Sequence, residues 1–434
     1  MQPLKTNRGT RAILAASLGN LLEWYDFAVY ALFAIYIGAN FFPHDSAAAG
    51  LVNAFLVFGL GFVIRPLGAI LIGIYGDRAG RKAALTATIL IMACGTLIIA
   101  AAPTYAAIGL GAPMVLLAGR VLQGFSAGGE IGSAAAFLVE HAPPSRKALF
   151  AAWLQASMGM SNILGALVAF TITSLLPKSE ILRWGWRVPF VIGLAIVPFG
   201  VYLRRTLEET PAFRAEVSVE RGARQPLRGV FRDHTAELTA GFGVSILWAA
   251  AVYVLLIFMP VFLQKALGFS PAQAFGASLA ENVAFVTGCF VSGALADRVG
   301  HWRIQTYGAV ALLVGVLPLF AWLDHSRSIG VLIVAVSCCG LMAAIYTGVA
   351  PTTLSALFPT PVRATGVSLT YNAGFTLFGG FAPAILTKVI ASGTGAAYAP
   401  AWFVMLAAIP ALIALRFGAG RRPTVPAPLA LGSG

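Results

Sequence analysis

The chain contains Gly73-Ile-Tyr-Gly-Asp77-Arg78-Ala-Gly80-Arg81-Lys82 and, later, Gly293-Ala-Leu-Ala-Asp297-Arg298-Val-Gly300-His301-Trp302-Arg303. Each stretch follows a long apolar run and opens a short basic loop before the next run. The spacing of the two copies is about half of the 434 residues. A repeat of this length in so apolar a sequence predicts a transporter built from two related halves.

The composition places the chain in a membrane. Hydrophobic residues make up 59% of the sequence and charged residues only 10%. A spanning helix needs about 20 mostly apolar residues. Twelve runs meet this requirement: 14–38, 50–75, 84–102, 112–138, 148–174, 188–204, 236–263, 273–296, 304–323, 329–355, 365–391 and 398–417. We therefore expect an all-α membrane protein with twelve transmembrane helices in two pseudo-symmetric six-helix halves.

The basic residues predict the orientation. With the N-terminus in the cytoplasm, most of the 29 Lys and Arg residues fall in cytoplasmic loops, as the positive-inside rule requires. Both termini are then cytoplasmic, and the net charge of +13 reflects topology instead of nucleic-acid binding. All four cysteines fall inside predicted spans, and the outside loops are short, which is compatible with a bacterial inner membrane.

A charged stretch divides the predicted spans into two sets. We expect an N-terminal half over 1–204, a cytoplasmic linker over 205–235, a C-terminal half over 236–420 and a disordered tail over 421–434. A monomer is the default, because the cavity would lie between the halves of one chain. The sequence contains no metal-ligand spacing, Walker-type loop or nucleophile–base set. It therefore predicts no enzymatic activity, and no cofactor apart from protons as the coupling ion.

Residues 73–82 resemble the loop signature of the major facilitator superfamily, G-x-x-x-D-R-x-G-R-[KR]. The chain is similar in particular to the metabolite:proton symporter family of that superfamily. The motifs that carry this resemblance are Gly19–Phe27, Phe41–Pro43, Gly61–Gly68, Arg120–Glu130, Trp184–Phe190 and Leu207–Pro211. The resemblance implies transport of an organic anion such as citrate, tricarballylate, α-ketoglutarate or shikimate, or of a zwitterion such as proline or betaine.

Ionisable groups within spans are expensive, so each of them is a candidate for function. Glu23 and Asp26 share a helical face near the middle of the first span, and Tyr30 continues that face. Two close carboxylates in a low dielectric resist double ionisation, which suits a proton relay. Arg65 lies about 18 Å inside its span, so it either faces Glu23 or Asp26 or binds an anionic substrate.

The fourth span combines Arg120, Gln123 and Glu130 in a polar stripe that we expect to line a cavity, with Arg120 as a substrate ligand and Glu130 as a further proton-coupling residue. An adjacent row of small residues, Gly124, Gly128 and Gly132, predicts close helix packing.

Glu281 stands beside Asn282 in a half that otherwise lacks charges inside its spans. It is a second proton site, a partner for Arg65 or Arg120, or a ligand for a cationic part of the substrate. The neutral residues that we expect at the substrate site are Tyr30, Gln123, Gln155, Asn162, Tyr253, Asn282, Tyr371 and Asn372.

The repeated cytoplasmic motifs resemble latches that close one side of a transporter and break when it switches. The gating candidates are Gly73, Asp77, Arg78, Gly80, Arg81, Glu140, Arg146, Asp297 and Arg363. In the second copy, His301-Trp302 replaces the usual basic pair, which predicts a weaker second latch.

The leading hypothesis is proton-coupled uptake of a small organic dicarboxylate or tricarboxylate. Tyr36–Pro43 and Phe378–Ala384 look most like the citrate and tricarballylate carriers of the family. Glu281 fits a trianion poorly unless it is protonated or paired, so a monocarboxylate or a betaine-like zwitterion stays open. An exporter or a transport-dead sensor would use the same fold.

Overall fold

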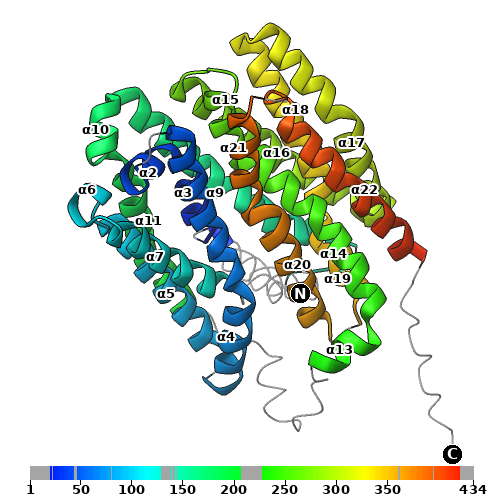
Figure 1. Cartoon of the computed structure of the whole chain (residues 1–434). Coiled ribbons are helices and arrows are strands. Elements are labelled where there is room, and N and C mark those ends of the chain that lie inside the picture. The colour runs from blue at the N-terminus through cyan, green and yellow to red at the C-terminus, as the bar shows by residue number, and fades with distance from the viewer. Residues whose placement is uncertain are drawn as a thin grey trace, which may run out of the picture.

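The computed structural model is helical throughout its described part, and its helices form two bundles that meet along a long interface (Figure 1). It describes residues 20–21, 23–43, 46–79, 81–128, 138, 142–143, 145–206, 227–359, 362–393 and 395–420. Within these residues, each of the twelve predicted spans contains helix. Eight described helices are long and apolar enough to cross a membrane, and two shorter apolar helices lie at Thr86–Ala101 and Gly185–Pro198.

The first bundle begins with a helix over residues 23–32 that continues into α2. Its elements are α2 (Ala34–Phe41), α3 (Ala47–Val63), α4 (Arg65–Ala79), α5 (Arg81–Ala101), α6 (Tyr105–Ile108), α7 (Gly111–Ala127), α9 (Lys147–Leu175), α10 (Lys178–Arg183), η1 (Gly185–Arg187) and α11 (Val188–Thr206). The predicted linker contains the short helix α13 (Leu227–Asp233), whereas residues 207–226 lie outside the described part.

The second bundle contains α14 (Thr235–Ala250), η2 (Ala251–Ile257), α15 (Met259–Lys265), α16 (Pro271–Val299), α17 (His301–Ser326), α18 (Ile329–Thr347), α19 (Ala350–Leu357), α20 (Arg363–Gly374), η4 (Phe375–Gly380), α21 (Ala382–Ala391) and α22 (Ala399–Gly420). A capping box starts α16, because Ser270 and Gln273 bond each other's backbone N–H groups. The tail over 421–434 lies outside the described residues.

Prolines interrupt the helices that line the centre. Pro260 and Pro383 each follow a π-helical segment, η2 and η4, by three residues. A proline inside a helix lacks an N–H and collides with the carbonyl four residues earlier, so the preceding turn widens. Pro66 likewise has no N–H to bond the carbonyl of Phe62, and the hydroxyl of Thr376 in η4 donates to that oxygen at 3.1 Å. The two halves are thus joined where the helices are irregular.

Glycines bring α7 close to α3 and α4. A Cβ on Gly124 would overlap the carbonyl oxygen of Gly61, and a Cβ on Gly128 would overlap that of Arg65. Small residues let helix backbones approach in this way inside a membrane. The predicted packing role is confirmed for Gly124 and Gly128, whereas Gly132 lies outside the described residues.

The outer faces of the bundles are apolar. On α22, Leu406, Ile409, Ile413 and Phe417 are all exposed at helical spacing. Exposed apolar stripes of this length are unfavourable in water and favourable against lipid. The helices therefore present these faces to a bilayer and keep their polar side chains inside.

The halves touch most extensively through α9 and α16, which pack along their length. Near the start of α9, Gly293 lies against Ala152; halfway along, Gly159 lies against Phe285. On the opposite side of the molecule α3 packs against η4 and α21. The residues that lie between the α9–α16 contact and the contact of α3 with η4 and α21 are covered by helices of both halves.

Candidate functional site

Two buried arginines form the centre of the candidate site. Arg65 is the first residue of α4 and Arg120 lies in α7, and the side chains of both are 0% exposed. Both guanidinium groups lie close to the ring of Phe27, with centroid distances of 4.6 and 4.7 Å. The two cations also interact electrostatically with each other. Two neighbouring buried cations require negative charge close by.

Arg65 faces Glu23, as one of the sequence-based alternatives predicted. The Nη2 atom of Arg65 is 4.0 Å from a carboxylate oxygen of Glu23, which is 4% exposed. None of the three guanidinium nitrogens of Arg65 makes a well-formed hydrogen bond within the described part of the chain, although the hydroxyl groups of Tyr253 and Tyr371 lie close to this guanidinium group. Arg65 is therefore charge-compensated by Glu23 but keeps N–H groups for another acceptor.

Arg120 is connected to Asp26 by a chain of hydrogen bonds. Its Nη1 donates to Oε1 of Gln123 at 2.7 Å, and Nε2 of Gln123 donates to Oγ1 of Thr96 at 3.0 Å. The hydroxyl of Thr96 in turn donates to Asp26 Oδ2. The predicted polar face of α7 is therefore present up to Gln123, whereas Glu130 lies outside the described residues.

Aromatic rings surround the arginines. Arg120 lies over the rings of Tyr30 and Phe58, at 4.6 Å from each centroid, and Arg65 lies 4.1 Å from the centroid of Phe62. The Tyr30 hydroxyl donates to the carbonyl of Ala54 at 3.0 Å, which fixes the orientation of its ring. Cation–π contacts of this kind stabilise guanidinium groups away from water.

The second half supplies the facing wall. The ring of Tyr253 in η2 contacts Trp24, Phe62 and Phe375, with centroid distances from 5.3 to 6.0 Å. Tyr371 of α20 stacks on Phe375 at 3.8 Å, and Tyr253 and Tyr371 both lie near Arg65.

A direct hydrogen bond also crosses between the halves beside this wall. The Nε1 of Trp248 in α14 donates to Oε1 of Gln155 in α9 at 3.1 Å. Of the predicted substrate residues, Tyr30, Gln155, Tyr253 and Tyr371 thus lie in or beside one shell around the arginines.

Three predicted residues make other contacts. Asn282 donates to the Ser278 carbonyl at 2.9 Å, and Asn372 donates to the Ser368 carbonyl at 2.9 Å, so each amide binds its own helix. Glu281 is 0% exposed and packs against Gly340 of α18, near Cys339. In the described region neither of its carboxylate oxygens has a hydrogen-bond partner, and neither arginine acts electrostatically on Glu281.

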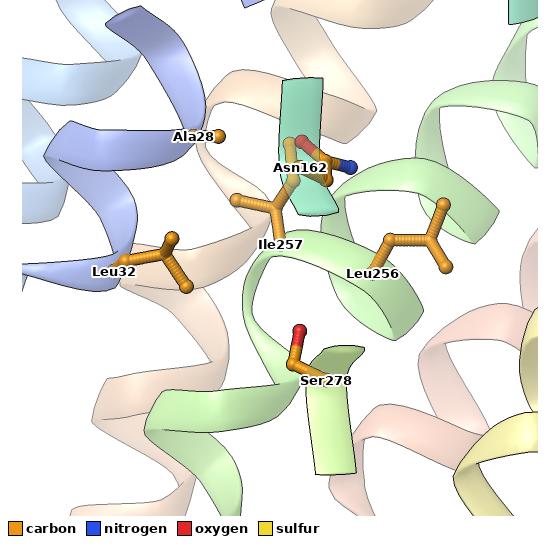
Figure 2. A pocket seen from close by; sticks show the side chains of 6 residues that line it. All are labelled: Ala28, Leu32, Asn162, Leu256, Ile257 and Ser278. Atoms are coloured by element: carbon orange, nitrogen blue, oxygen red, sulfur yellow. The ribbon is translucent and has the colours of Figure 1, made fainter. Parts of the chain in front are cut away.

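Asn162 borders a separate small cavity of about 10 Å³. Figure 2 shows its amide together with Ser278 and the apolar side chains of Ala28, Leu32, Leu256 and Ile257. A space of this size is at the lower limit for one water molecule. The arginines are not among the residues that line this cavity. The role of Asn162 as a substrate ligand therefore remains a prediction.

Of the gating candidates, Asp297 makes the clearest contact. Its two carboxylate oxygens accept from the backbone N–H groups of Ala148 and Leu149, at 2.8 and 3.1 Å. The N–H groups in the first turn of a helix have no acceptor within that helix. The exposed N-cap residue of α9, Arg146, does not supply one with its side chain, so Asp297 does. An acid at a helix N-terminus also interacts favourably with the helix dipole.

Arg363 donates through Nε to the carbonyl of Ser355 at 3.1 Å. The remaining gating candidates are less fully described. Gly73, Asp77 and Arg78 lie in α4 and Arg81 opens α5, but only their backbone is described, while Gly80 and Glu140 lie outside the described residues.

Sequence reasoning missed Thr96, Phe62 and Phe375 as members of the site. The Thr96 hydroxyl also lies 3.1 Å from the carbonyl oxygen of Met92, an alternative acceptor that threonines inside helices commonly use, so the residue type alone carries no signal. The chain has 29 Phe residues, and most aromatic residues in spans serve packing. Only the position of Phe62 over Arg65, and of Phe375 against Tyr253 and Tyr371, distinguishes these two rings from the others.

The arrangement suits binding of an anion and a proton. Among the residues that the structure describes, no group of three or more His, Cys, Asp or Glu side chains could hold a metal ion. The buried carboxylates can each take up a proton, and the guanidinium N–H groups can bind carboxylate oxygens in two-fold geometry.

Comparison with known proteins supports a common fold and ancestry. The family model of the Major Facilitator Superfamily matches residues 16–383. The chain is 34% identical over 416 residues to a citrate-proton symporter of Salmonella typhi, covering 95% of this chain and 94% of that protein. It is also 34% identical to a proline/betaine transporter of Salmonella typhimurium, covering 93% of this chain and 82% of the relative.

The crystal structure of a D-xylose-proton symporter superimposes with a TM-score of 0.76 at 18% identity, covering 95% of this chain and 99% of that chain. This likeness extends over both bundles and agrees with the predicted two-half architecture.

Proposed function

The chain belongs to the Major Facilitator Superfamily, in its metabolite:proton symporter family, and we propose that it carries out proton-coupled uptake of a small organic carboxylate by alternating access. It is a multi-pass membrane transporter, which we place in a bacterial inner membrane as a monomer with both termini in the cytoplasm. Arg65 carries the proposal: it is fully buried, and its N–H groups make no well-formed hydrogen bond within the described residues. A substrate carboxylate would supply an acceptor.

Proton coupling follows from the balance of charge. Glu23 and Asp26 offset the charges of Arg65 and Arg120 when all four are ionised. A proton on Asp26 leaves the site with one net positive charge, so proton binding and anion binding favour each other. Bringing a trianion in against 100 mV, inside negative, costs about 7 kcal/mol, from about 2.3 kcal/mol per charge. Protons that accompany the anion remove this opposition.

We favour a citrate-like or tricarballylate-like substrate. Two arginines in one shell suit a molecule with two or more carboxylates, because each guanidinium can form a bidentate pair. The citrate-proton symporter of Salmonella typhi is among the most similar relatives and matches nearly the full chain. Tyr30, Gln155, Tyr253 and Tyr371 then supply hydrogen-bonding groups and ring surfaces to the remainder of the substrate.

A betaine-like zwitterion is the second candidate, and the aromatic wall favours it. Trp24, Tyr253 and Phe375 form a group of neighbouring rings, of which Tyr253 lies near Arg65. Rings of this kind bind quaternary ammonium groups, while an arginine binds the carboxylate of the same molecule. The equal identity to the proline/betaine transporter keeps this alternative open.

Alternating access requires a contact that breaks. We propose that Asp297 is part of the gate between α16 and α9, since it supplies acceptors to the first turn of the helix in the other half. Asp77 holds the position of Asp297 in the first copy of the repeated motif, so we propose the same gating role for Asp77 and its neighbours.

The test is uptake by the purified protein in liposomes with an imposed pH gradient. Labelled citrate, tricarballylate, succinate, shikimate and glycine betaine are compared in the same preparation. Accumulation of a polycarboxylate that disappears in Arg65→Gln, with the variant shown to be folded by size-exclusion chromatography, supports the leading proposal. Accumulation of glycine betaine alone selects the second candidate. Exchange without accumulation under the gradient for every compound would refute proton-coupled uptake of these classes.

A further inference from the structure

The hydrogen bonds around Asp26 assign a role to Thr96, which lies in the C-terminal half of α5. Its hydroxyl has three neighbours: Asp26 Oδ2, the carbonyl oxygen of Met92 at 3.1 Å and Nε2 of Gln123 at 3.0 Å. A hydroxyl has one hydrogen to donate and two lone pairs that accept. Its hydrogen therefore has two alternative acceptors, the carboxylate and the backbone carbonyl.

The two acceptors correspond to the two protonation states of Asp26. When Asp26 is ionised, the Thr96 hydroxyl donates to it, and Gln123 donates to Thr96. When Asp26 carries a proton, the carboxylic acid donates to Thr96 and the Thr96 hydrogen turns to the Met92 carbonyl. In both states the oxygen of Thr96 still accepts from Gln123, so the bond from Gln123 to Arg120 is kept.

The immediate surroundings of Asp26 leave few alternatives to this arrangement. From α7 it is faced by the cation Arg120, and from α11 by the backbone of Gly193, where a Cβ would lie 2.9 Å from Asp26 Oδ1. Its own helix contributes Tyr25, whose hydroxyl donates to the Pro189 carbonyl at 2.9 Å, and Glu23 one turn away beside Arg65. The contribution of α5 is Thr96 itself, and within the described residues Asp26 Oδ1 has no hydrogen-bond partner.

We propose that Thr96 is a positioning residue that works as a two-position hydrogen-bond switch, allowing Asp26 to gain and lose a proton while Arg120 stays in place. The inference rests on the proposed function for the identification of Asp26 as the proton site. It explains why a threonine hydroxyl stands between a carboxylate and an amide whose oxygen is already bound to an arginine. A hydroxyl can reverse its role as donor or acceptor, whereas the ammonium group of a lysine cannot accept.

The first test measures the proton on Asp26 directly, without substrate. Infrared spectra of the protein in liposomes are recorded across pH, and the carboxylic C=O band that Asp26→Asn removes is titrated. Thr96→Val removes the hydroxyl and retains the shape. Since the lost bond is stronger to the charged carboxylate than to the neutral acid, we expect the midpoint to move to higher pH by about one unit, or about 1.4 kcal/mol.

Two further variants separate the switch from a general loss of structure. Thr96→Ser keeps the hydroxyl and restores the midpoint, and Thr96→Cys, with a weaker donor, gives an intermediate shift. Thr387→Val is the matched control: the Thr387 hydroxyl is buried in α21 and donates only to the Pro383 carbonyl of its own helix, at 2.7 Å. We expect Thr387→Val to leave the midpoint of the Asp26 band unchanged. A midpoint that is the same in Thr96→Val and in the unaltered protein would overturn the proposal.

Transport is then assayed with the same proteins, so that the two proposals fail separately. If the infrared midpoint shifts but no substrate moves protons, the switch stands and the proposed symport is wrong. If the unaltered protein couples protons to substrate and Thr96→Val shifts neither the infrared midpoint nor the pH profile of uptake, symport stands and the switch is wrong.

Discussion

Breaking the buried contact between Arg65 and Glu23 is the sharpest perturbation of the site. At the observed 4.0 Å, two unit charges interact by about 4 kcal/mol at an effective dielectric constant of 20. Removing one partner leaves the other charge buried and uncompensated, which destabilises a protein by about 3–5 kcal/mol. We expect Arg65→Gln and Glu23→Gln each to lower the free energy of unfolding by that amount.

The double variant Glu23→Gln/Arg65→Gln replaces the charges by two amides. It should lose clearly less than the sum of the single changes, with a coupling energy of about 2–3 kcal/mol. The assay is reversible unfolding in mixed detergent micelles. The matched control is Glu180→Gln/Arg183→Gln, an exposed pair at 3.7 Å, which should couple by less than about 1 kcal/mol. Additive losses at Glu23 and Arg65, within about 0.5 kcal/mol, would refute the interaction.

Other predictions concern the proton site, the gate and the packing. Asp26→Asn should abolish concentrative uptake yet keep substrate exchange, measured with labelled substrate; loss of both would argue for a binding role instead. Asp297→Ala removes two hydrogen bonds at the start of α9, worth about 0.5–2 kcal/mol. A cysteine at the buried position Ala296 should therefore be labelled up to roughly 30-fold faster, and an unchanged rate would contradict the gate. Gly124→Ala should prevent folding, judged by size-exclusion chromatography, whereas Gly111→Ala, whose Cβ meets Ile108 only at 3.4 Å, should be tolerated.

The sequence predicts the architecture because the bilayer restricts the choices. A spanning segment must be helical to satisfy its backbone, so apolar run length alone locates the helices. The repeated motifs at Asp77 and Asp297 then supply the division into halves. The irregular segments η2 and η4 were not predicted, since the effect of Pro260 and Pro383 depends on what the neighbouring helices can bond.

The charged members of the site were found by the same argument. Glu23, Asp26, Arg65 and Arg120 stand out because ionisable groups are rare inside spans. The rarity of ionisable groups in spans does not show which neighbouring helix a given side chain contacts. Glu281 is as buried as Arg65, yet it packs on α18, and its roles as a proton site or ligand stay predictions.

Neutral residues were harder to judge. Asn372 was expected beside Tyr371 at the site, but its amide binds Ser368 of its own helix, and only Tyr371 joins the aromatic wall. Thr96 shows the opposite case, because an ordinary-looking hydroxyl completes the link from Arg120 to Asp26. Such roles depend on helix–helix distances, which the pattern of one sequence does not contain.

Substrate-induced proton movement in proteoliposomes tests the central claim most directly. A pH dye outside the vesicles is followed while citrate, and then glycine betaine, is added to the unaltered protein and to Asp26→Asn. We predict alkalinisation outside with one of these substrates and none in the variant. Substrate entry without any pH change in the unaltered protein would contradict the account.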